Sequence, residues 1–246
     1  MAGTEILGRL TWMAATVTEV RDETPRVRSI VFECPGWDGH HAGQHVDIRL
    51  TAEDGYQAQR SYSIASAPED DHLVLTIERL QDGEVSPYLF DVVQPGDQLE
   101  MRGPIGGYFI WDGSGAEPLF MIAGGSGVVP FRSMLRHRAA AGSRAPARLL
   151  YSSRSLEDVI YREELGEPGD GAAVIHTLTR SQPEGWQGHR RRIDADMLEE
   201  VGFAPESAPW IFICGPTTFV EVGAGALVDL GHDPMMIRTE RFGPSG

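Results

Sequence analysis

Apolar and polar positions follow two different rhythms along this chain. In the first half, short runs of alternating apolar and polar residues are separated by turn signals such as Pro35-Gly36 and Asp54-Gly55. A period of two is that of a β-strand with one buried face, and Gly and Pro mark turns. We therefore predict six strands, which cover residues 10–22, 27–34, 44–51, 60–66, 73–80 and 97–104. Short strands joined by tight turns are typical of an antiparallel barrel or sandwich.

From about residue 118, apolar runs of strand length alternate with segments of helix length. The run 118–124 is followed by a Gly-rich turn and a helical pattern over 130–142. The alternation continues, with strands predicted at 147–153, 172–179, 210–215 and 235–242, and helices at 155–166, 194–202 and 217–231. Such alternation predicts a parallel, doubly wound α/β sheet. We accordingly predict an antiparallel β-barrel domain over 1–112 and an α/β domain over 117–246.

The composition narrows the classes of partner. Of 246 residues, 36 are acidic and 21 are basic, every basic one being Arg, and the net charge is −15. Such a charge opposes binding to nucleic acid or to an anionic membrane. The sequence has no 18-residue apolar run, and its N-terminus lacks the basic start and apolar core of a secretory signal. We expect a cytoplasmic protein that binds neither nucleic acid nor membrane.

Metal-ligating residues are sparse. The two cysteines, Cys34 and Cys214, cannot supply a four-cysteine iron–sulfur or zinc site. A cluster of histidines at 40, 41 and 45 is interrupted by Gly43, which argues against a helix that would align two of them. We predict a surface loop there and no metal site.

The Gly-rich turn in "FMIAGGSGVVPF" (120–131) is the strongest single motif. Gly124, Gly125 and Gly127 follow a predicted strand and precede a helix, so backbone N–H groups can approach a pyrophosphate at the helix N-terminus. Pro130 stands where the usual dinucleotide fingerprint has a third Gly, and Pro is favoured at a helix start. A tight strand-to-helix turn without a ligand is the alternative.

The end of the next predicted strand indicates which nucleotide would bind. Ser152 and Arg154 stand there, and no carboxylate appears before Glu157. A carboxylate would hold a ribose 2′-hydroxyl, whereas hydroxyls and a guanidinium suit a 2′-phosphate. This pattern favours NADPH over NADH. A helix capped by Ser155, with a solvated Arg154, is the alternative.

The stretch "RSYSIAS" (60–66) carries an unusual set of side chains for a strand. Alternation places Arg60 and Tyr62 on one face and Ser61 and Ser63 on the other. Taken alone, the stretch slightly favours an ordinary edge strand, with its Arg extended to solvent and its Tyr half buried.

Two further motifs lie at element ends. In "DGEVSPYL" (82–89), Gly83 and Ser86 precede a helical segment over 86–93, whose first N–H groups would form an anion site or a simply capped start. "FICGPTTF" places Cys214, Gly215 and Pro216 at the carboxyl end of a strand, where ligands of open α/β sheets bind. No histidine is placed in the sequence to activate Cys214, so we do not predict a nucleophile.

In combination these motifs resemble the ferredoxin–NADP⁺ reductase superfamily. "RSYSIAS", "DGEVSPYL", "GPIGGYF", "GGSGVVPF", "CGPTTF" and "ERF" occur in the order of that family and cover nearly the whole chain. The resemblance implies an FAD-binding barrel followed by an NAD(P)-binding α/β domain. It also implies an FAD-dependent NAD(P)H reductase.

The resemblance assigns roles to individual positions. Arg60 would pair with the flavin pyrophosphate and Tyr62 would stack on the isoalloxazine. Ser63, near flavin N5, would belong to the reaction centre together with Cys214 and Glu240. With the positions argued above, the predicted cofactor-binding residues are Arg60, Ser61, Tyr62, Ser63, Gly83, Val85, Ser86, Gly124, Gly125, Gly127, Val128, Pro130, Ser152, Arg154, Cys214, Gly215, Pro216 and Phe242.

The chain departs from many relatives in one respect. Those relatives carry a fused [2Fe–2S] domain with a closely spaced cysteine run, which two cysteines cannot supply. Electrons would therefore pass to a separate ferredoxin-like protein or oxygenase component, or to a small acceptor. An electron-transfer subunit of a larger complex and a non-catalytic nucleotide-sensing module on the same fold are the alternatives.

Overall fold

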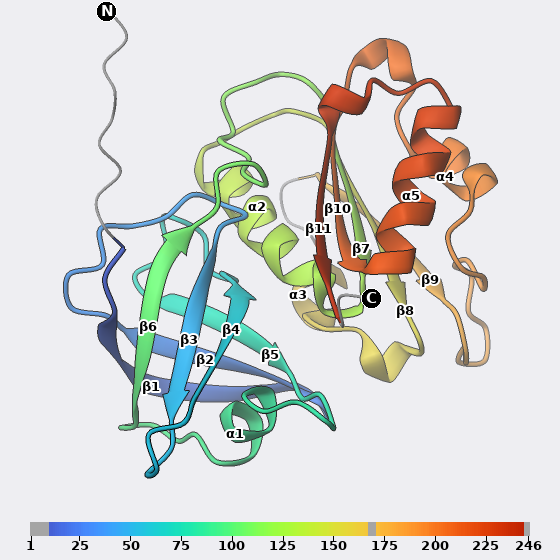
Figure 1. Cartoon of the computed structure of the whole chain (residues 1–246). Coiled ribbons are helices and arrows are strands. Elements are labelled where there is room, and N and C mark those ends of the chain that lie inside the picture. The colour runs from blue at the N-terminus through green and yellow to red at the C-terminus, as the bar shows by residue number, and fades with distance from the viewer. Residues whose placement is uncertain (1–9, 167–170, 244–246) are drawn as a thin grey trace, which may run out of the picture.

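The first half of the chain folds into a six-stranded antiparallel sheet (Figure 1). The computed structural model describes residues 10–166 and 171–243. The sheet order is β4-β3-β6-β1-β2-β5, and Ile64, just beyond β4, bridges to Leu75 of β5. This bridge closes the sheet, so the predicted barrel is confirmed. The strands are β1 (Met13–Thr24), β2 (Val27–Glu33), β3 (His45–Thr51), β4 (Gln57–Ser63), β5 (Leu73–Glu78) and β6 (Gln98–Ile105).

Alternate positions of these strands fill the barrel. Val46 and Ile48 of β3 are fully buried and belong to the same apolar cluster as Ile30 of β2 and Met101 of β6. Helix α1 (Ser86–Asp91) adds Leu89 to this cluster. The barrel is therefore a filled core, and ligands must bind outside it.

The second half forms a five-stranded parallel sheet in the order β11-β10-β7-β8-β9. Its strands are β7 (Leu119–Gly124), β8 (Ala147–Ser153), β9 (Ala173–Leu178), β10 (Trp210–Pro216) and β11 (Ile237–Phe242). The helices are α2 (Val129–Ala140), α3 (Arg162–Gly166), α4 (Ala195–Val201) and α5 (Thr217–Asp229). Figure 1 shows α2 on one face of the sheet, with α4 and α5 on the other.

This double winding follows from the continuous apolar run of β7. Met121 packs with Phe131 of α2, whereas Ile122 belongs to the cluster formed with Val220 of α5. Parallel strands covered on both faces require apolar residues at every position, and β7 is buried throughout. The predicted doubly wound sheet is confirmed.

One predicted helix is wrong. Residues 155–166 form a 3₁₀ turn at Leu156–Asp158 and the short α3, not a continuous helix. Tyr161 interrupts the segment because its φ of 58° lies in the left-handed region, and its buried hydroxyl donates to Thr76 of β5. A contact with the other domain therefore overrides the local helical pattern.

The two domains pack along α2. Ser133 donates to the Ser66 carbonyl at 2.6 Å, and Arg132 donates to the Ala65 carbonyl at 3.2 Å. Strand β6 ends at Ile105 and β7 begins at Leu119, so residues 106–118 connect the two sheets. The predicted boundary at 112–117 falls in this connection.

Within residues 10–166 and 171–243, no helix is long and apolar enough to cross a membrane. In the same residues, no three His, Cys, Asp or Glu side chains are grouped so as to hold a metal ion. Cys34 and Cys214 are free thiols.

Candidate functional site

A cavity of about 710 Å³ opens where the two domains meet. The barrel contributes the end of β4, β5 and the segment that leads into α1. The α/β domain contributes the turn after β7, the start of α2 and the end of β11. The lining residues are Arg60, Ser61, Tyr62, Ser63, Thr76, Glu78, Leu80, Gln81, Asp82, Gly83, Glu84, Val85, Ser86, Ser126, Val129, Phe242 and Gly243.

Four consecutive residues of strand β4, Arg60–Ser63, line this cavity. Arg60 donates to the Glu84 carboxylate at 2.6 Å, and both side chains are half exposed. Tyr62 is largely buried, and this burial raises the pKa of its hydroxyl. Ser61 donates to the buried Asp47 carboxylate at 2.6 Å. The hydroxyl of Ser61 is therefore committed to the barrel, although its residue borders the cavity.

The turn before α1 forms a narrow cradle beside Arg60. Ser86 is buried, and its hydroxyl accepts the backbone N–H of Leu80 at 3.1 Å. A Cβ at Gly83 would lie only 2.8 Å from that hydroxyl oxygen. No side chain caps α1, whose N-cap is Val85. Gly83, Val85 and Ser86 line one wall of the cavity, and their predicted contact with a cofactor stays a prediction.

The Gly-rich turn has the predicted strand–turn–helix form. Gly125–Val128 form a 3₁₀ turn between β7 and α2, and no side chain caps its N-terminus. Gly127 packs so closely on β10 that a Cβ there would lie 2.1 Å from the Cys214 carbonyl oxygen. Pro130 occupies the first turn of α2. The glycine at 127 therefore lets the turn lie directly against β10.

Cys214 and Glu240 are direct partners in the register of β10 and β11. Burial raises the pKa of the Cys214 thiol, and the nearby Glu240 raises it further. Burial likewise raises the pKa of Glu240 to about 7. Neither residue lines the cavity, whereas Phe242, two positions beyond Glu240, does and is 36% exposed.

The structure brings only part of the predicted set together. Ser63, Arg60, Tyr62 and Phe242 share the cavity, but Arg154 is exposed and lies outside it. The other predicted residues outside the lining are Gly124, Gly125, Gly127, Val128, Pro130, Ser152, Cys214, Gly215, Pro216 and Glu240. They lie toward the carboxyl ends of parallel strands, in the turn after β7 or, for Pro130, in the first turn of α2, where a second ligand of such a sheet binds.

Three acidic lining residues, Glu78, Asp82 and Glu84, were not predicted. Glu84 pairs with Arg60, and Glu78 accepts a 2.7 Å hydrogen bond from Ser126. The residues of each pair are 24 and 48 positions apart, so no local period relates them. Thr76, which accepts from Tyr161, was missed for the same reason.

Two sequence families match consecutive parts of the chain. Residues 14–110 match the oxidoreductase FAD-binding domain, and residues 121–224 match the oxidoreductase NAD-binding domain. The ferredoxin–NADP reductase B of Sorangium cellulosum is 36% identical over 241 residues, which is 93% of this chain and 96% of that protein.

Reductase components of oxygenases are also similar. The reductase component of propane 2-monooxygenase from Mycolicibacterium goodii is 31% identical over 85% of this chain, and the match covers 62% of that protein. The glycine betaine monooxygenase reductase subunit of Pseudomonas aeruginosa PAO1 is 32% identical, and the match covers 56% of it. The chain thus spans about six-tenths of the length of these relatives.

Solved structures share the two-domain arrangement. A cytochrome P450 reductase from Amycolatopsis has a TM-score of 0.83 at 26% identity, over 99% of this chain and 74% of that one. A ferredoxin NADP⁺ reductase from Neisseria gonorrhoeae with bound FAD and NADP has a TM-score of 0.80 at 22% identity, over 94% and 98% of the two chains. The similarity to the Neisseria gonorrhoeae structure is one of fold alone.

A closed barrel joined to a doubly wound sheet, with a cavity where they meet, suits an oxidoreductase that uses a flavin and a nicotinamide nucleotide. The two matched families agree with both halves of this description. The chain belongs to the ferredoxin–NADP⁺ reductase family and is an FAD-dependent NAD(P)H reductase.

The residues of the cavity fit a flavin dinucleotide. A guanidinium beside a glycine cradle suits a pyrophosphate, and a largely buried aromatic ring suits a flat ring system. The cavity volume lies within the range of about 300–1,000 Å³ that is usual for ligand sites. The uncapped turn at Gly125–Val128 fits the phosphates of the second nucleotide.

Proposed function

We propose that this reductase passes electrons from NADPH to a separate acceptor protein, either a ferredoxin-like protein or an oxygenase component. The supporting observation is that β4 of the barrel, with Arg60 and Tyr62, lines the same cavity as Ser126 and Phe242 of the α/β domain. Bound FAD supplies the chemistry, because it takes up a hydride and releases single electrons. The protein contributes the positioning of the two ring systems.

Arg60 would hold the flavin pyrophosphate. Its guanidinium now donates to Glu84, so phosphate oxygens would compete with that carboxylate. Gly83, Val85 and Ser86 would enclose the diphosphate from the other side, since a glycine at 83 leaves no Cβ in the way. Tyr62 would stack on the ring system, and the Ser63 hydroxyl would lie at its reactive nitrogen.

The nicotinamide would enter from the side of β10 and β11. Cys214 and Gly215 end β10 there, and Phe242 is the exposed ring at the cavity edge. Glu240 has a pKa of about 7, so it carries a proton in part of the molecules at neutral pH. We propose that the protonated form of Glu240 lies beside the Cys214 thiol, so that the region behind Phe242 is uncharged in that fraction of the molecules.

Coenzyme choice would depend on Ser152 and Arg154. Ser152 is the penultimate residue of β8 and pairs with Gly124 of β7, and Arg154 is exposed immediately beyond the strand. We expect kcat/KM for NADPH to exceed that for NADH, and Arg154→Ala to lower only the NADPH value, by about tenfold. Arg162→Ala, another exposed arginine, is the control. Equal values for the two coenzymes in the wild type would refute this preference.

The acceptor is tested separately from the flavin reaction. The FAD-loaded protein should oxidise NADPH with ferricyanide, and should also reduce a [2Fe–2S] ferredoxin or the iron–sulfur oxygenase component from its host. Ferricyanide reduction without reduction of either protein would contradict the proposed acceptor class. A nucleotide-sensing module would instead bind NADPH while its flavin stays oxidised.

The last alternative is a subunit that acts only within a larger complex. Such a subunit would co-purify from its host with fixed partners at constant ratio, whereas a free-standing reductase would not.

A further inference from the structure

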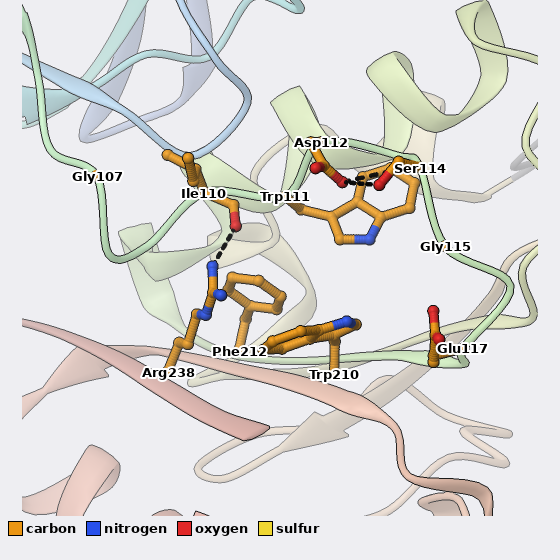
Figure 2. Close-up of a pocket in the computed structure, with 10 residues that line it drawn as sticks. All are labelled: Gly107, Ile110, Trp111, Asp112, Ser114, Gly115, Glu117, Trp210, Phe212 and Arg238. Atoms are coloured by element: carbon orange, nitrogen blue, oxygen red, sulfur yellow. Dashed lines mark hydrogen bonds between the residues drawn. The ribbon is translucent and has the colours of Figure 1, made fainter. Parts of the chain in front are cut away.

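A second cavity, of about 370 Å³, lies at the opposite end of β10 and β11 from the flavin cavity (Figure 2). It lies between the connection 107–117 and the first residues of these two strands. The two cavities share no lining residue. Because ligands of open α/β sheets bind at the carboxyl ends of the strands, this cavity is not part of the reductase site.

Arg238 is the one cation in the lining of this cavity. Its guanidinium carbon lies 4.3 Å from the centre of the Trp210 ring, and Nη1 donates to the Ile110 carbonyl at 2.7 Å. Within the described residues no carboxylate forms an ion pair with it. A guanidinium has several further N–H donors, which match a carboxylate in a paired geometry. The Arg238 guanidinium is therefore fixed in position, and within the described residues no carboxylate neutralises its charge.

Two carboxylates line the same cavity. Asp112 accepts from the backbone N–H and the hydroxyl of Ser114, which hold its pKa below the ordinary value and keep it ionised at neutral pH. Glu117 is exposed at another edge of the opening, away from Arg238 in Figure 2. A ligand with only a negative charge would be repelled by both carboxylates. A ligand that also carries a positive charge would be attracted by them.

Aromatic rings form the walls between these charges. The indoles of Trp111 and Trp210 lie on opposite sides of the opening in Figure 2, and Phe212 lies behind Arg238. Indole faces bind flat apolar groups and also ammonium groups. The cavity volume is at the small end of the range of about 300–1,000 Å³ for ligand sites, so the ligand is a small molecule.

We propose that this cavity binds a small zwitterion, namely an α-amino acid with an aromatic side chain. Its carboxylate would pair with Arg238, its ammonium, on the adjoining carbon, would face Asp112, and its ring would lie between Trp111 and Trp210. Glu117 would attract the ammonium from a greater distance. This site does not depend on the identity of the electron acceptor or on the preferred coenzyme.

The binding test uses three matched compounds on the FAD-loaded protein. L-phenylalanine has both charges, 3-phenylpropionate lacks the ammonium, and 2-phenylethylamine lacks the carboxylate. By titration calorimetry, we expect L-phenylalanine to bind saturably. Each of the other two compounds should bind at least about tenfold more weakly, because each lacks one charge-assisted hydrogen bond. Absence of L-phenylalanine binding, or equal binding of either truncated compound, would overturn the proposal.

Variants then locate the site. Arg238→Gln should weaken L-phenylalanine binding by about tenfold or more, whereas Arg190→Gln should not. Arg190 is a suitable control because it too donates to a single backbone carbonyl, that of Trp186. Because Glu117 is exposed, the Glu117→Gln variant should fold normally. It should bind L-phenylalanine severalfold more weakly and oxidise NADPH at an unchanged rate. Unchanged affinity in both Arg238→Gln and Glu117→Gln would place the ligand elsewhere and overturn the assignment.

Discussion

Ser126 donates a 2.7 Å hydrogen bond to Glu78, and this contact joins the two domains inside the flavin cavity. Ser126 belongs to the Gly-rich turn after β7, and Glu78 is the last residue of β5. A carboxylate therefore lies against the turn that we propose to bind nucleotide phosphates. Since like charges repel, we expect Glu78 to weaken that binding while its hydrogen bond with Ser126 holds the turn in place.

Removing this charge should tighten nucleotide binding. Glu78→Gln keeps an oxygen acceptor for Ser126 but carries no charge, so we expect the KM for NADPH to fall about threefold to tenfold, the effect of roughly 1 kcal/mol. Steady-state kinetics with ferricyanide measure it. Glu69→Gln, at the His137 contact between the domains, is the control. An unchanged or higher KM in Glu78→Gln would show that the carboxylate does not oppose the nucleotide.

The Arg60–Glu84 pair gives two opposite effects on flavin affinity. Arg60→Gln should raise the Kd for FAD by about tenfold or more, because it removes a charge-assisted hydrogen bond to the pyrophosphate. Glu84→Gln should lower the Kd, because it frees Arg60 from its 2.6 Å ion pair.

Fluorescence titration of apoprotein with FAD measures both values. Arg49→Gln is a matched control, because Arg49 also forms a 2.6 Å ion pair on the barrel, with Glu100, but does not line the cavity. If Arg49→Gln and Arg60→Gln weaken FAD equally, the effect is one of barrel stability and the assigned role of Arg60 is wrong.

Glu240 should make the folded protein less stable as the pH rises. Its pKa is raised from 4.5 to about 7 in the folded state, so the folded protein binds the proton more tightly than the unfolded chain. The free energy of unfolding then falls between pH 4.5 and 7 and is flat above, by at most about 3 kcal/mol at 1.36 kcal/mol per pKa unit.

Glu240→Gln should remove this dependence. We expect the Tm of the variant minus that of the wild type, measured on FAD-loaded protein, to increase from pH 5 to pH 7 and then to level off. Taking the difference cancels the other titrating groups. A difference that is constant across this range would mean that Glu240 titrates at its ordinary pKa.

Gly127 should tolerate no side chain. A Cβ there would lie 2.1 Å from the Cys214 carbonyl oxygen, so Gly127→Ala must displace the turn from β10 and should cost about 1–3 kcal/mol. Gly225 in α5 has open space around it, and Gly225→Ala should instead stabilise by about 0.5–1 kcal/mol. Thermal unfolding of both variants measures this contrast. Equal Tm values for the two would contradict the close packing.

Most of the architecture could be predicted from local periodicity. The continuous apolar run of β7 corresponds directly to a strand that is covered on both faces. Local periodicity failed over residues 155–166, where the predicted helix is wrong. Its pattern is helical, but Tyr161 adopts a left-handed φ and contacts Thr76 of the other domain.

Sequence reasoning could predict those parts of the site that lie at the ends of strands or in turns. Arg60 and Tyr62 are unusual side chains for a strand and Gly83 stands in a turn motif, but the family resemblance was needed to predict all three as cofactor contacts; all three line the cavity. Glu78 and Glu84 were missed because their partners are distant in sequence and are brought close only by barrel closure and domain packing. The role of each predicted cofactor contact stays a prediction until ligand binding is measured.

The most direct measurement is anaerobic mixing of the purified, FAD-loaded protein with NADPH while the visible flavin absorbance is followed. We expect a yellow protein whose flavin absorbance bleaches within a single turnover, faster with NADPH than with NADH. A protein that retains no FAD after reconstitution, or whose bound flavin stays oxidised with both nucleotides, would contradict the account.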